Sequence, residues 1–109
     1  MGTINHDAVI ATFHREESKI TIESWIAGLD ESEQRVFAVS PFVTNSYFSV
    51  VMFPDGSKEG WGTSNEFDDL RARFIALSES QSASVVHVSY GELGFKVKHN
   101  PDGVIGEEV

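Results

Sequence analysis

The chain has 109 residues, no cysteine, and a formal charge of −9 that comes from 17 acidic and 8 basic side chains. This length fits one domain around one hydrophobic core. The absence of cysteine excludes disulfides, thiolate nucleophiles and cysteine-ligated metal centres. Because an excess of carboxylates repels phosphate groups, we expect neither direct nucleic-acid binding nor binding to a membrane surface.

The N-terminal residues contain neither the basic segment nor the apolar core of a signal peptide. No apolar run approaches the roughly 18 residues needed to span a bilayer. We therefore expect a protein that stays in the cytoplasm. The acidic residues are spread along the chain, which favours ordinary solubility over mimicry of a nucleic acid.

The N-terminal part of the chain predicts two strands. Residues 8–14 form a short β-compatible run, and residues 19–26 alternate between apolar and polar side chains. The polar residues 15–18 between them have the length of a hairpin connection. The alternation places on one face of the second strand Ile20, Ile22 and Ile26. It places on the other face Thr21, Glu23 and Trp25.

Residues 30–39 leave two alternatives open. Asp30 and Glu33 have the spacing of a capping box, which predicts one or two helical turns. The segment from Val36 to Val39 fits equally well as a short strand that ends before Pro41.

A hairpin is predicted in the middle of the chain. Residues 47–53 are rich in β-branched and aromatic side chains, and residues 58–62 are expected to return as the second strand. Between them residues 54–57 read Pro-Asp-Gly-Ser, in which proline fixes φ and glycine supplies a positive φ. We expect Trp61 in the core. Alternation gives a core set of Phe48, Val50 and Met52. It leaves outside Tyr47, Ser49 and Val51.

One principal helix is predicted over about residues 64–78. Thr63 and Glu66 have the T-x-x-E spacing of a capping box, and Asp69 and Arg73 form an i,i+4 ion pair of favourable orientation. Apolar side chains recur at three- and four-residue spacing and form one stripe: Phe67, Leu70, Phe74 and Leu77.

Two further strands are predicted after the helix. Residues 85–90 read as one strand, residues 91–94 as its turn, and residues 95–98 as the return strand. We expect the side chains that face the helix to be Val86, Val88, Tyr90, Phe95 and Val97. The opposite face then carries Val85, His87 and Ser89. We expect residues 1–103 to form the single domain and residues 104–109 to be a short, acidic, flexible tail.

These elements predict an α+β domain with a mainly antiparallel, hairpin-rich sheet of about five to six strands and one principal helix on one face. One helix covers only part of a sheet face, so the other face is left to solvent or a partner. That face carries the candidate partner-binding residues: Trp25, Glu23, Tyr47, Val51 and His87. Amphipathic aromatic rings among polar side chains are typical of protein interfaces. The competing interpretation is that Trp25 and Tyr47 pack beneath residues 29–45.

We find in the sequence no motif that is typical of a metal site, a catalytic nucleophile or a phosphate-binding loop. The histidines have no H-x-x-x-H spacing that presets two metal ligands on one helix face, so we expect no metal site. There is no G-x-S-x-G nucleophile elbow and no phosphate-binding loop, and we expect no catalytic residue and no cofactor. An enzyme would need a deep pocket that places His14 or His87 beside a carboxylate.

The function favoured by the sequence is a non-catalytic protein-binding domain. In composition the chain is similar to small acidic inhibitors of phage or bacterial origin and to toxin-immunity proteins, although no motif carries this likeness. The expected partner is a protein with a basic surface. The alternative is a homodimeric structural protein that associates through the uncovered sheet face or an edge strand. A small enzyme is the third, less favoured hypothesis.

Overall fold

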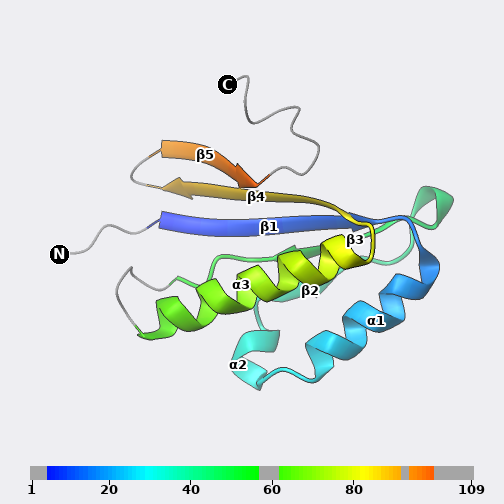
Figure 1. The fold of residues 1–109 in the computed structure, drawn as a ribbon, viewed down its shortest axis with the longest axis horizontal. Coiled ribbons are helices and arrows are strands. Elements are labelled where there is room, and N and C mark those ends of the chain that lie inside the picture. Colours follow the sequence, from blue (N-terminus) through cyan, green and yellow to red (C-terminus); the bar gives the residue numbers. More distant parts are fainter. Residues whose placement is uncertain (1–4, 57–61, 92–93, 100–109) are drawn as a thin grey trace.

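The computed structural model describes residues 5–56, 62–91 and 94–99 (Figure 1), with the side chains of residues 5, 62–64 and 98–99 not described. In these described ranges three helices and five strands follow one another, with a short 3-10 turn at Thr44–Ser46. Their bounds are β1 (Asn5–Phe13), α1 (Glu16–Ala27), α2 (Glu31–Gln34), β2 (Phe37–Val39), β3 (Phe48–Met52), α3 (Gly62–Ser80), β4 (Ser84–Gly91) and β5 (Gly94–His99).

The strands form one antiparallel sheet in the order β2-β3-β1-β4-β5. Since β3 and β4 both run antiparallel to β1, they are parallel to each other, and α3 is the crossover between them. The order β1-α1-β2-β3-α3-β4 is the split β-α-β connectivity of ferredoxin-like domains, to which β5 adds an edge strand. The predicted α+β class is confirmed. This connectivity supports many unrelated functions, so it does not indicate one.

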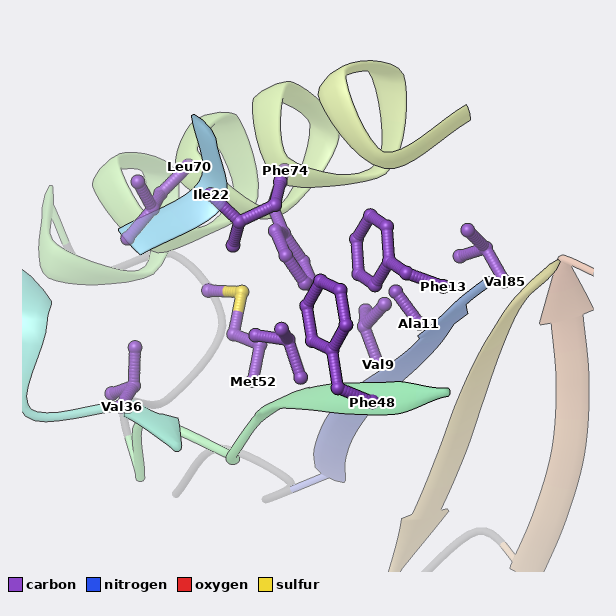
Figure 2. Close-up of a cluster of buried hydrophobic side chains, with 11 residues drawn as sticks. Val9, Ala11, Phe13, Ile22, Val36, Phe48, Met52, Leu70, Phe74 and Val85 are labelled. Atoms are coloured by element: carbon purple, nitrogen blue, oxygen red, sulfur yellow. The ribbon is translucent and has the colours of Figure 1, made fainter. Parts of the chain in front are cut away.

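The hydrophobic core lies between the sheet and the helices α1 and α3. Figure 2 shows side chains of β1 and β3 pointing toward α3, with Ile22 of α1 beside them. The rings of Phe13 and Phe48 stack at 4.8 Å between centroids. The fully buried apolar residues are Val9, Ala11, Phe13, Ile22, Phe48, Val50, Met52, Leu70 and Phe74. The core set predicted for the middle strand is therefore confirmed.

The predicted principal helix is α3, which begins at Gly62 and ends at Ser80. Its apolar stripe faces the core as expected, with the middle of the stripe fully buried and both ends partly buried. The predicted ion pair is present, because Arg73 Nε donates to Asp69 Oδ2 at 3.0 Å. The side chain of Thr63, and with it the predicted capping box, lies outside the described residues.

Two other predictions fall on parts of the chain that are not described. Residues 57–61, which include Trp61 and most of the expected return strand of the central hairpin, lie outside the described residues. Gly62, the last residue of that expected strand, is the first residue of α3. The expected tail at residues 104–109 also lies outside the described residues.

Residues 15–27 are the largest correction to the predicted fold. Residues 15–18 were expected to be a hairpin connection and residues 19–26 a strand, but Glu16–Ala27 form the helix α1. The β-branched isoleucines and threonine favour a strand, and the alternation matches a period of two over a short window. The side chains that reach the core instead follow three- and four-residue spacing: Ile22, Trp25, Ile26 and Leu29. Burial of these apolar side chains outweighs the weak local preference for a strand.

Both alternatives considered for residues 30–39 occur, one after the other. The helix α2 is a single turn in which Glu33 Oε1 accepts a hydrogen bond from the backbone N–H of Asp30 at 3.3 Å. The strand β2 follows directly and pairs with β3 at the edge of the sheet.

The strands β4 and β5 present the faces opposite to those predicted. Val85 is 3 % exposed and Ser89 is 7 % exposed, because they pair with Ala11 and Asp7 on the helix-covered face of β1. The side chains expected to face the helix therefore point away from it: Val86, Val88, Tyr90, Phe95 and Val97. A strand that is apolar on both sides gives no alternation that fixes its orientation.

Candidate functional site

The sheet face turned away from α1 and α3 is the candidate functional site, and we call it the open face. Its members follow from the register, because directly paired residues of neighbouring strands point to the same face. The described members are Ala38 of β2; Ser49 and Val51 of β3; His6, Ala8, Ile10 and Thr12 of β1; Ser84, Val86, Val88 and Tyr90 of β4; and Phe95 and Val97 of β5.

One end of the open face is an aromatic row. Tyr90 of β4 lies between His6 of β1 and Phe95 of β5. The ring centroids of His6 and Tyr90 are 5.3 Å apart. Tyr90 is 40 % exposed and Phe95 is 66 % exposed, so these rings offer apolar surface that the described part of the chain leaves uncovered.

The middle of the open face is aliphatic. Ile10 lies at its centre, between Val51 of β3 and Val86 of β4, and it is 42 % exposed. The next row on the same face, two residues along each strand, contains Ala8, Val88 and Val97, all half-buried. These side chains therefore join the aromatic row into one continuous apolar surface across β3, β1, β4 and β5.

The other end of the open face is polar. Thr12 lies between Ser49 and Ser84, and the hydroxyl oxygens of Thr12 and Ser49 are 2.9 Å apart. Just beyond this row, the ring of Tyr47 lies 6.3 Å from that of His14. This end therefore bounds the apolar surface with hydroxyl groups and amphipathic rings.

The described residues of the open face include no aspartate, glutamate, lysine or arginine, although the whole chain carries a charge of −9. The acidic side chains concentrate on the helices, for example at Glu16, Glu17 and Glu23 of α1 and Asp68 and Asp69 of α3. Single exposed apolar residues are normal, but a contiguous apolar patch is typical of an interaction site.

The residues proposed from the sequence do not come together on this face. Val51 lies on it, and Tyr47, which is 44 % exposed, borders it. Trp25 is in α1, where its ring stacks on Phe74 at 6.1 Å and meets the edge of Phe37 at 5.6 Å. Glu23 and His87 also lie on the helix side.

Glu23 lines an open groove between α1 and the segment after β2. The groove has a volume of about 530 Å³ and is lined by Glu16, Glu17, Lys19, Ile20, Glu23 and Phe42. Lys19 Nζ lies 4.5 Å above the centre of the Phe42 ring. The Glu17 carboxylate accepts hydrogen bonds from the backbone N–H of Glu17 itself and from the Arg15 side chain, and both keep the pKa of Glu17 below its ordinary value. The groove therefore combines exposed carboxylates with an apolar wall.

His87 has a carboxylate neighbour. Its Nε2 lies 3.0 Å from Asp7 Oδ1, and the two side chains are 15 % and 21 % exposed. Ser89 is buried on the same face. The pair fits a cross-strand contact that satisfies partly buried polar groups. Within the described ranges, no three His, Asp or Glu side chains converge as metal ligands.

An uncovered face was predicted, and Ser49 and Val51 lie on it as expected. Its other residues were not predicted, because α1 was expected to be a strand and β4 was expected to present the opposite face to the helices. One signal in the sequence does point to the correct residues. In β3 and β4 neighbouring positions such as Val50 and Val51, or Val85 and Val86, are all apolar. Such strands are normally covered on both faces, so a chain with helices on one side leaves an apolar face unpaired.

Comparison of the chain with protein-family models, with curated proteins and with solved structures finds no match. None of the helices in the described ranges combines the length and the apolar character needed to cross a bilayer.

Proposed function

We propose that this chain is a non-catalytic protein-binding domain and that the open face is its binding surface. The observation that carries the proposal is the continuous apolar surface over β3, β1, β4 and β5. Removing apolar surface from water contributes roughly 25 cal/mol per Å². The exposed rings of Tyr90 and Phe95 and the central side chain of Ile10 are therefore the main source of binding free energy on this face.

The chemistry of the open face favours a protein as the partner. A nucleic acid needs cationic side chains that neutralise phosphates, and the described open face has none. Aromatic rings next to an aliphatic centre, bordered by hydroxyl groups, match the apolar core and polar rim of protein interfaces. The charged helices on the other side keep the free chain soluble while this face is exposed.

The proposed function is tested by affinity capture from an extract of the producing cells. The bait is the wild-type chain, the Ile10→Lys variant or the Ile20→Lys variant, and bound proteins are identified by mass spectrometry. Ile20 is a matched control, because it is 72 % exposed on α1, on the helix side. We expect the wild type and Ile20→Lys to retain the same protein, and Ile10→Lys to lose it. Equal capture by all three baits would contradict the proposal.

A second candidate surface is the groove beside α1. Three glutamates and the apolar side chains of Ile20 and Phe42 line it, a combination that suits a basic and apolar segment of a partner. This version of the function corresponds to an acidic inhibitor of a basic protein. In the same experiment it predicts the reverse result, with capture lost in Ile20→Lys and kept in Ile10→Lys.

A further inference from the structure

We infer that the partner of the open face is a second copy of this chain, so that two sheets pack face to face in a symmetric homodimer. The inference rests on the proposed function, because it names the occupant of the same face. Closed two-fold dimers are the commonest soluble oligomers, and they need one self-complementary patch.

The charge distribution supports a second copy as the occupant. Two chains of −9 repel each other, and the repulsion is smallest where neither copy presents carboxylates. The open face meets this condition among the described residues, whereas α1, α2 and α3 carry many acidic side chains. In a face-to-face dimer the acidic helices of both copies lie on the outside, as far apart as the assembly allows. A basic partner would find no carboxylate on the open face with which to pair.

The size of the face suits a small, reversible interface. The strands β1, β3, β4 and β5 have nine, five, eight and six residues, and at about 4.8 Å between strands and 3.3 Å per residue they give a patch of roughly 450 Å² per copy. Two such patches bury about 900 Å², the size of a weak interface. We therefore expect a weak, reversible dimer.

The position of Ile10 suits the middle of such an interface. It lies on β1, the central strand of the sheet, with Val51 on one side and Val86 on the other. Face-to-face sheets lie about 10 Å apart, and their side chains interdigitate. Near a two-fold axis Ile10 of one copy therefore packs close to Ile10 of the other, with the helices of both copies outside.

The inference is tested by sedimentation equilibrium of the full chain over a wide range of concentrations. We expect the wild type to approach twice the 12.0 kDa mass of one chain as its concentration rises. Ile10→Lys places a cation from each copy in the interface, so it should raise the dissociation constant on the order of 100-fold. Ala76→Lys introduces the same charge at an exposed position of α3, outside both candidate surfaces, and should leave the dissociation constant nearly unchanged. Circular dichroism of both variants checks that they remain folded.

The other outcomes overturn the inference in distinguishable ways. A wild type that stays monomeric excludes a second copy, while capture of another protein that depends on Ile10 would still support the proposed function. A dimer that Ile10→Lys leaves intact would show that the copies meet elsewhere, for example along the edge strand β5. If Ile10→Lys unfolds, Phe95→Ser, at the exposed end of the face, provides the second test, and an unchanged dissociation constant there would also contradict the inference.

Discussion

Trp25 is partly buried and packs against the hydrophobic core. Its ring contacts Phe74 of α3 and Phe37 of β2, so it links α1 to the helix α3 and to the edge of the sheet. The sequence predicts Trp25 as an interface residue, but from these contacts we expect its substitution to lower the free energy of unfolding. Loss of partner binding in a Trp25 variant would then follow from unfolding and would not identify the interface.

We expect Trp25→Ala to lower the free energy of unfolding by about 2–4 kcal/mol, because it leaves a cavity beside Phe74. Tyr47→Ala removes an aromatic side chain that is 44 % exposed and should cost less than about 1 kcal/mol. Urea unfolding followed by circular dichroism measures both. Similar losses in the two variants would show that Trp25 is not packed between the layers as described.

Glu66 of α3 is a carboxyl group whose ionised form is disfavoured in the folded state. Desolvation raises its pKa above the ordinary 4.5, and a hydrogen bond with Glu33 and repulsion from Glu33 and Asp30 raise it further. The folded chain therefore holds this proton to higher pH than the unfolded chain. Stability is present when Glu66 is protonated and falls as the pH rises from 4.5 through the raised pKa.

Glu66→Gln removes this charge, so we expect a higher urea midpoint than that of the wild type at neutral pH. The difference should disappear below pH 4.5, where Glu66 is protonated in both states of the wild type. Glu23→Gln, on the exposed side of α1, controls for the loss of one negative charge from an acidic chain. If Glu23→Gln stabilised the chain as much as Glu66→Gln, the effect would come from net charge and not from the contact with α2.

At the scale of elements, α1 shows how burial decides between helix and strand. A strand would place Ile20 and Ile22 on one face, where they would be buried equally. In the helix Ile22 is fully buried and Ile20 is 72 % exposed. Two isoleucines that lie two positions apart in the sequence therefore differ completely in their surroundings.

We expect Ile22→Ala to cost about 2–4 kcal/mol of stability. Ile20→Ala should change it by no more than about 0.5 kcal/mol, because the residue is exposed and alanine is a good helix former. The same chemical change two residues apart makes the comparison internally controlled, and thermal or urea unfolding provides the measurement. Equal destabilisation by the two substitutions would contradict the helix α1 and would support a strand that buries Ile20 and Ile22 on one face.

The difference between predicted and observed elements has a physical cause. The helix α3 was predictable because its apolar stripe and its ion pair between Asp69 and Arg73 are local. The helix α1 was not, because its isoleucines and threonine prefer strands and its helical form depends on contacts with Phe37 and Phe74. The orientation of β4 depends on its register with β1, a pairing between residues far apart in the sequence.

At the scale of the whole molecule, the pairing between strands that are far apart in the sequence decides which side chains the sheet exposes. The sequence predicts an uncovered sheet face, but which side chains occupy it follows only from the register of β1 with β3 and β4. Trp25 and His87 contribute to the helix side, while Ile10, Val86 and Val88 form the open face. The helices therefore carry most of the acidic side chains of the described residues, while the described part of the open face is uncharged and apolar, and the proposed dimer rests on this difference.

The most direct test of this account is crosslinking between copies at a single introduced cysteine, which is possible because the chain has none. Ile10→Cys places a thiol at the centre of the open face, and Ala76→Cys places one at an exposed position of α3. A flexible bismaleimide that spans up to about 10 Å can join two thiols that point toward each other between sheets stacked about 10 Å apart. We predict a covalent dimer from Ile10→Cys and none from Ala76→Cys. Equal crosslinking at the two positions, or none at Ile10→Cys, would contradict the account.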